Sequence, residues 1–109
     1  GGMADNPRYA LYKAKYEAML ANKMNEEADA TYTVAGKCCE SGDMLVMDAK
    51  LPKAEQGDLL LVSSTGAYNY SMSSNYNRLP KLPVVFVKDG ISRLVVKGET
   101  LEDLIRQDI

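Results

Sequence analysis

Residues 84–96 read Val-Val-Phe-Val-Lys-Asp-Gly-Ile-Ser-Arg-Leu-Val-Val and carry the clearest local signal of structure in the chain. Two runs rich in strand-forming residues flank Asp89-Gly90, a dipeptide typical of a tight hairpin turn with positive φ angles. Pro80 and Pro83 lie just before the first run and keep the backbone there extended, because proline disfavours the helical conformation in the residue before it. The sequence therefore predicts an antiparallel hairpin over 84–96.

Three further strands are expected upstream of this hairpin. Residues 31–34 are rich in β-branched and aromatic side chains and end at Gly36, and residues 44–47 follow a Ser-Gly-Asp turn. Residues 59–62 form a continuous apolar run, which is typical of a strand buried on both faces. We expect residues 51–58 to be a surface connection between the second and third of these strands.

Both ends of the chain have helical features. Aromatic and apolar residues recur at helical spacing over 9–24, and Thr100 begins a capping-box pattern that predicts a short helix closing the domain. Residues 1–3, Gly-Gly-Met, look like a remnant of expression and are left out of the fold argument. We therefore expect residues 4–109 to form one mainly β domain with a short N-terminal helix and a short C-terminal helix.

The composition excludes several function classes. The 109 residues fit one small domain, and 13 basic against 15 acidic side chains give a net charge of −2 without any Lys/Arg block. That balance argues against a role driven by charge attraction to nucleic acid or to a membrane surface. No apolar run approaches the roughly 20 residues of a membrane span, and no signal peptide opens the chain. We expect a cytoplasmic protein.

The ionisable residues restrict the chemistry further. Histidine is absent, which removes the commonest general base and the usual zinc ligand, and the two cysteines, Cys38 and Cys39, are adjacent. A disulfide between neighbouring residues is strained, and two adjacent thiols cannot complete a four-ligand metal site. We therefore expect no metal site, and any chemistry must come from a thiol, carboxylates, tyrosines or lysines.

Residues 38–43, Cys-Cys-Glu-Ser-Gly-Asp, form the densest reactive cluster, in which a thiol lies next to a carboxylate. A thiol with an ordinary pKa of about 8.5 is mostly protonated at neutral pH, which suits a proton donor. The alternative interpretation is that Cys38 and Cys39 are small buried hydrophobic residues beside a polar turn.

Two other groups could bind a ligand. Residues 66–78 interleave Tyr and Asn with small residues, as binding loops often do, although a surface or interface loop has the same composition. Arg8 and Tyr12 are four residues apart and would share one face of a helix, where they could hold a carboxylate or simply be solvated.

Five stretches of the chain form a recognisable series of motifs. They are Arg-Tyr-Ala-Leu-Tyr at 8–12, Cys-Glu-Ser-Gly-Asp at 39–43, Gly-Ala-Tyr at 66–68, Ser-Met-Ser-Ser-Asn-Tyr-Asn at 71–77 and the tail at 82–109. In this order they resemble the C-terminal part of diaminopimelate decarboxylases. The resemblance covers nearly all of the chain, and its Cys-Glu-Ser-Gly-Asp string is highly specific.

The resemblance implies a fold and an activity. These are fold-type III enzymes dependent on pyridoxal 5'-phosphate, which convert meso-2,6-diaminopimelate to L-lysine and CO2 in the last step of lysine biosynthesis. A (β/α)8 barrel carries the cofactor lysine, and a C-terminal β-barrel or Greek-key-like sandwich domain completes the active site of the second subunit in a homodimer. The barrel and its lysine motif are not in these 109 residues, so we expect this fragment to be inactive alone.

The resemblance also implies a role for each matching residue. Cys39 would be the acid that protonates carbon after CO2 is lost, acting across the dimer interface, with Cys38 as a second thiol beside it. Glu40 would receive the distal ammonium of the substrate. Arg8 and Tyr12 would clamp its distal carboxylate, and Tyr68 would lie against both the cofactor and the substrate.

Some alternatives stay open on the sequence. Periodicity favours one helix over 9–24, whereas the family pattern implies a short helix over 8–13 and a strand over 17–23, which we favour. Because the family's domain takes a strand from the N-terminus of the enzyme, we also expect an unpaired sheet edge and self-association. Rival functions are a related arginine, ornithine or carboxynorspermidine decarboxylase domain, and a freestanding β-barrel binding module with 68–76 as its binding loop.

Overall fold

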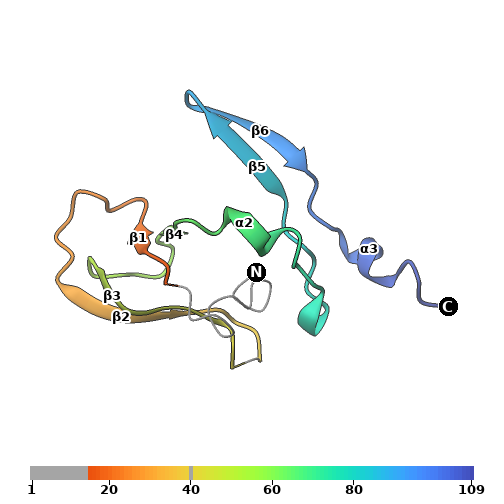
Figure 1. Cartoon of the computed structure of the whole chain (residues 1–109), viewed down its shortest axis with the longest axis horizontal. Helices are drawn as coiled ribbons and strands as arrows, with labels where there is room; N and C mark the ends of the chain where they lie inside the picture. The colour runs from red at the N-terminus through yellow and green to blue at the C-terminus, as the bar shows by residue number, and fades with distance from the viewer. Residues whose placement is uncertain (1–14, 40) are drawn as a thin grey trace.

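Antiparallel strands form most of the regular structure in this computed structural model, which describes residues 15–39 and 41–109 (Figure 1). Two short helices and a 3-10 turn lie between or after the strands. In chain order the elements are β1 Ala18–Leu20, β2 Ala30–Ala35, β3 Met44–Leu51, β4 Leu60–Val62, α2 Gly66–Asn69, η1 Tyr76–Arg78, β5 Val84–Lys88, β6 Ile91–Val96 and α3 Leu101–Ile105.

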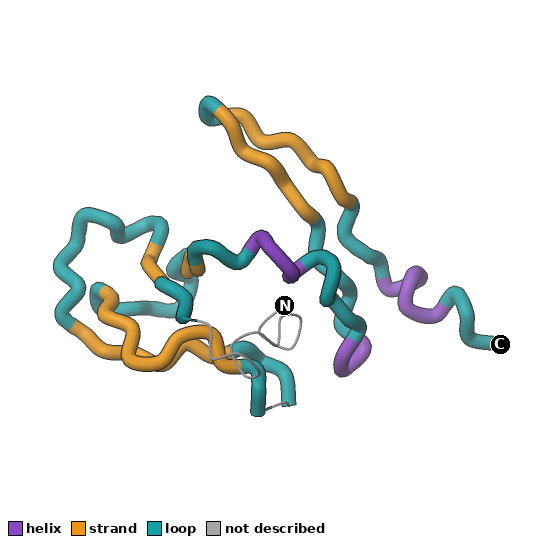
Figure 2. Tube along the Cα trace, viewed as in Figure 1, coloured by secondary structure: helices purple, strands orange, loops and turns teal. Residues whose placement is uncertain are grey.

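The strands pair as three separate two-stranded sheets, β1 with β4, β2 with β3 and β5 with β6. Figure 2 shows them as three orange pairs joined by long loops. The prediction of a mainly β chain is confirmed. No closed barrel is formed by the strands that the structure describes, so the finer barrel or Greek-key expectation is not met within these residues.

The hydrophobic core is small and sits on the β2–β3 pair. Val34, Ala49 and Leu51 are buried there, and β1 packs against β3 so that Leu20 is buried as well. Such a core is modest for the chain length. The radius of gyration of 15.4 Å exceeds the ~13 Å that a compact domain of this size would have. The described elements are therefore arranged openly.

The hairpin predicted over 84–96 is confirmed. Asp89 and Gly90 form its turn with φ angles of 52° and 74°, as an Asp-Gly turn between strands requires. The β5–β6 hairpin extends away from the other two sheets (Figure 1). Its apolar side chains are consequently exposed, with Phe86 at 58% and Val87 at 72% of full exposure.

Three other predictions are corrected by the structure. A continuous helix over 9–24 is wrong, because Ala18–Leu20 is strand and turns follow it. The strand implied by the family pattern is present but shorter than 17–23, and its helix over 8–13 lies outside the described residues. Residues 59–62 are not buried on both faces, because among the described strands only β1 pairs with β4, and Leu60 and Leu61 remain exposed.

The connection over 51–58 does not lie wholly on the surface, contrary to the prediction from the sequence. β3 continues to Leu51, and both Leu51 and Pro52 are buried.

The C-terminal helix forms with a capping box between Thr100 and Asp103, as predicted. It does not close the domain, since Leu101 and Ile105 stay exposed. No helix within 15–39 and 41–109 is both long and apolar enough to cross a bilayer.

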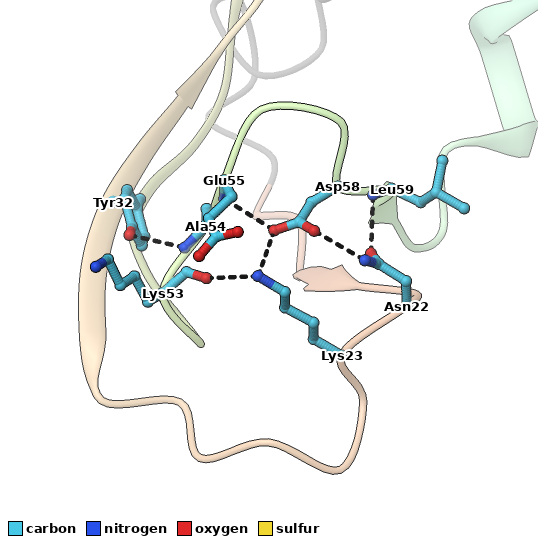
Figure 3. A network of polar contacts seen from close by, with 8 residues as sticks. All are labelled: Asn22, Lys23, Tyr32, Lys53, Ala54, Glu55, Asp58 and Leu59. Atoms are coloured by element: carbon cyan, nitrogen blue, oxygen red, sulfur yellow. Dashed lines mark hydrogen bonds and ion pairs between the residues drawn. The ribbon is translucent and has the colours of Figure 1, made fainter.

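A polar network joins the turn after β1 to the connection between β3 and β4 (Figure 3). The Lys23 ammonium lies 2.8 Å from Asp58 Oδ2 and donates to the Lys53 carbonyl, and Asn22 Nδ2 donates to Asp58 Oδ1 at 2.8 Å. The Glu55 amide donates to the same carboxylate. These bonds fix the path of the chain that leads into β4.

The network favours the charged form of Asp58. The hydrogen bond from Lys23, with those from Asn22 and the Glu55 amide, lowers the pKa of Asp58 from 3.8 to about 2. The carboxylate is better stabilised in the folded chain than in the unfolded one. This contribution to stability is therefore complete above the unfolded pKa near 3.8 and is lost as the pH falls through about 2.

Replacing Lys23 by Met should raise the pKa of Asp58 from about 2 toward 3.8, because the strongest donor to the carboxylate is removed. An NMR titration of the Asp58 carboxyl carbon measures this pKa directly. Lys37→Met removes an equal charge from an exposed site outside the network and should leave the titration unchanged. Equal midpoints in the two variants would contradict the network's effect.

Candidate functional site

Cys39 lies in the connection between β2 and β3, which is closed by Asp43. The Gly36 amide donates to the Asp43 carbonyl at 2.8 Å, and the Cys38 amide donates to Asp43 Oδ2 at 2.9 Å. Asp43 itself is buried at 2% exposure. One residue thus closes the loop through its backbone and holds the cysteine segment through its side chain.

Gly36 makes this arrangement possible. A Cβ atom at this position would collide with the Asp43 carboxylate, so only glycine lets the carboxylate reach the Cys38 amide. From the sequence, Gly36 was expected only to end a strand. The structure gives it a packing role in the loop that carries both thiols.

The two thiols differ in exposure. Cys38 is half-buried and Cys39 is exposed, and neither forms a disulfide. The interpretation of both cysteines as small buried residues is therefore wrong for Cys39. An exposed thiol on a tightly closed loop is accessible to a reacting group that approaches from outside the chain.

Tyr68 lies in the loop between β4 and β5, in the short helix α2. Its φ of 74° is uncommon for an aromatic residue and kinks the helix, and its side chain is exposed. The carbonyl of Tyr68 accepts a hydrogen bond from the Met72 amide at 2.8 Å, and Ser73 Oγ donates to the Tyr70 carbonyl at 2.8 Å. These local bonds give the loop a defined turn.

The two candidate loops meet through Tyr76. Its hydroxyl donates to the Cys39 carbonyl at 2.8 Å, across 37 positions of sequence. Both loops stand out in the sequence, but no local pattern pairs Tyr76 with Cys39. The structure thus brings the thiol segment and the Tyr-Asn-Ser loop together.

Glu99 anchors the same loop from the other side. Its carboxylate accepts hydrogen bonds from Asn75 Nδ2 at 2.6 Å and from the Lys81 amide at 2.7 Å. The Lys81 amide and then Asn75 lower the pKa of Glu99. Sequence reasoning missed Glu99, because only the fold brings the segment after β6 beside the loop.

Three of the predicted site residues lie outside the described part of the chain. They are Arg8, Tyr12 and Glu40, so their proposed contacts stay predictions. Among the residues that are described, no three Cys, Asp or Glu side chains gather where they could hold a metal ion.

Replacing Gly36 by Ala should displace the Asp43 carboxylate and loosen the cysteine loop, at a cost of about 1–3 kcal/mol for overpacking. Hydrogen exchange of the amides at 36–43 in the full-length protein should then become faster. Gly66→Ala is the matched control, because a Cβ there has open space and no positive φ to strain. Unchanged protection in the Gly36→Ala protein would rule out the packing role.

Known proteins that resemble this chain also carry a sheet domain, in agreement with the observed strands. The family model "Pyridoxal-dependent decarboxylase, C-terminal sheet domain" matches residues 1–66. Diaminopimelate decarboxylases of Bacillus subtilis and of Synechocystis are 59% and 56% identical to the chain. These matches cover 100% and 99% of this chain, but only 25% and 23% of the two relatives. The chain thus spans about a quarter of their length.

Solved structures show the same likeness. A diaminopimelate decarboxylase from M. jannaschii matches with a TM-score of 0.87 and 36% identity, over 100% of this chain and 25% of that one. The Helicobacter pylori enzyme complexed with L-lysine matches with a TM-score of 0.83 and 39% identity, over 97% and 26%. Because the family model matches more than half of the residues, this chain belongs to the pyridoxal-dependent decarboxylases and carries their C-terminal sheet domain.

Proposed function

We propose that the chain is the C-terminal domain of a diaminopimelate decarboxylase, which as a whole enzyme converts meso-2,6-diaminopimelate to L-lysine and CO2. The observation that carries the proposal is the match to relatives of that name along the entire chain, at up to 59% identity. In this proposal the domain supplies a proton donor and substrate contacts. A separate (β/α)8 barrel domain supplies the cofactor lysine, and a second subunit completes the homodimer.

Cys39 is the proton donor in this proposal. Decarboxylation replaces a C–CO2 bond by a C–H bond, so one proton must reach carbon. The S–H bond of Cys39 breaks as the new C–H bond forms with the electron pair on carbon, and the thiolate later regains a proton from solvent. The exposure of Cys39 and the closure of its loop by Asp43 support this role.

Pyridoxal 5'-phosphate, when bound, supplies the electron sink for this reaction. The described residues fit one side of such a group. Tyr68 presents an exposed aromatic ring from a kinked, hydrogen-bonded turn, which suits contact with a planar cofactor and its substrate. The remaining contacts to the cofactor would come from the barrel domain.

The chemistry of the substrate explains the other proposed contacts. Its distal end carries a carboxylate and an ammonium, which need partners of opposite charge. The Arg8 fork with the Tyr12 hydroxyl would bind the carboxylate, and Glu40 would bind the ammonium. Glu40 follows Cys39 directly in sequence, so the proton donor and this contact would be neighbours along the chain.

The exposed apolar surface favours a larger assembly. Val87 on the hairpin and Leu60 and Leu61 on β4 remain exposed in the described chain. An isolated two-stranded hairpin is at best marginally stable in water, so β5 and β6 need neighbours. We infer that the barrel domain and the second subunit supply them, and that further strands complete the sheet domain there.

Replacing Cys39 by Ala in the full-length enzyme should slow turnover by about 10²- to 10⁴-fold, because a positioned proton donor is lost. Cofactor absorbance should be retained. Cys38→Ala is the matched control: it removes the neighbouring half-buried thiol, and turnover should change little. Near-normal turnover in the Cys39→Ala enzyme would show that Cys39 is not the donor.

The 109-residue chain by itself should release no CO2 from diaminopimelate and should not change the absorbance spectrum of added pyridoxal 5'-phosphate. The reason is that the cofactor lysine belongs to the barrel domain in this proposal. Measurements on the isolated chain and on the full-length enzyme, side by side, test this. Decarboxylation by the chain alone would refute the proposal that a separate barrel domain supplies the cofactor lysine.

A further inference from the structure

Tyr76 is the residue through which the loop between β4 and β5 contacts the thiol segment. Its hydroxyl donates to the Cys39 carbonyl at 2.8 Å, and the tyrosine belongs to the 3-10 turn Tyr76–Arg78. The hydroxyl is thereby committed to a backbone acceptor. This geometry suits a residue that holds Cys39 in place better than one that reacts.

The turn that carries Tyr76 is itself fixed. The neighbouring Asn75 side chain donates both to Glu99 Oε2 at 2.6 Å and to the Leu79 carbonyl at 3.1 Å. The Arg78 amide also donates to the Asn75 carbonyl at 2.7 Å. Because Asn75 donates to a charged acceptor, the backbone next to Tyr76 is held in place, and this restrains the position of the Tyr76 side chain.

Cys39 is therefore held from two directions. Within its own loop, Asp43 accepts from the amide of the preceding residue, Cys38, at 2.9 Å. From the other loop, Tyr76 donates to the carbonyl of Cys39 itself. The two bonds lie at either end of the Cys38–Cys39 backbone, so together they restrict the direction of the Cα–Cβ bond that carries the Cys39 thiol.

We propose that Tyr76 is a positioning residue for proton donation by Cys39, holding its backbone so that the exposed thiol faces the reacting carbon. The inference rests on the proposed role of Cys39 and adds a residue to it. Misplacement of a reacting group by about 1 Å can cost up to about 10²-fold in rate. Losing the hydrogen bond from Tyr76 should therefore lower kcat by about tenfold, with little change in KM.

Tyr76→Phe in the full-length enzyme is the test, because it removes only the hydroxyl. We expect kcat to fall about tenfold and KM to stay within about twofold, the pattern for an interaction that matters only in the reaction step. Tyr70→Phe removes an exposed hydroxyl from the same loop for which the described residues provide no hydrogen bond, and it should behave as the unchanged enzyme. An unchanged kcat in Tyr76→Phe, or an equal loss in Tyr70→Phe, would overturn the proposal.

A double-mutant cycle separates positioning from general loss of structure. If Tyr76 acts through the thiol, Tyr76→Phe should reduce kcat less than twofold when Cys39 is already Ala. The same tenfold loss in both backgrounds would overturn the proposal. If Cys39→Ala itself keeps normal turnover, the proposed role of Cys39 fails and Tyr76 loses its role with it. If Cys39→Ala lowers kcat but Tyr76→Phe does not, the proposed function stands and only the positioning role of Tyr76 is refuted.

Hydrogen exchange gives a readout that does not depend on activity. In the cofactor-free full-length enzyme, Tyr76→Phe should speed exchange at residues 37–42 by several-fold, because the hydrogen bond from Tyr76 to that segment is gone. The Tyr70→Phe enzyme should exchange there at the normal rate. Unchanged exchange at 37–42 in Tyr76→Phe would overturn the proposal.

Discussion

The buried Asp43 carboxylate is the interaction on which the candidate site depends. Its side chain accepts from the Cys38 amide, its carbonyl accepts from the Gly36 amide, and the missing side chain of Gly36 provides the space. Burying a carboxylate costs free energy unless it accepts hydrogen bonds. The loop is therefore restricted to conformations in which Asp43 keeps these bonds. Asp43 thus holds the backbone beside Cys39, within the same loop, through the amide of Cys38.

The loops of this chain are ordered mainly by polar hydrogen bonds, since the hydrophobic core is small. The described chain buries few apolar side chains, and its radius of gyration is that of an open arrangement. Order in the loops comes instead from charged or polar side chains that each accept or donate several bonds, such as Asp58 and Glu99. Exposed bonds of this kind fix geometry more than they add stability.

Local chemistry made the hairpin and the C-terminal helix predictable. Asp89-Gly90 permits positive φ angles, and Thr100 with Asp103 forms a reciprocal cap, so each pattern specifies its own geometry. The periodicity over 9–24 misled, because pairing with β4 outweighs the weak preference of these residues for helix. The cysteine motif identified the loop, whereas the contacts of Tyr76 and Glu99 span 37 and 24 positions of sequence and could not be read from local pattern.

The hairpin of β5 and β6 has apolar residues on both of its sides. Val85 and Val87 share one side with Leu94, while Phe86 alternates to the other, and all four are exposed. Because a two-stranded hairpin alone is at best marginally stable in water, this hairpin would gain stability from neighbours on both faces. A polar side chain at Val87 should consequently weaken the packing of that face and, with it, the hairpin itself.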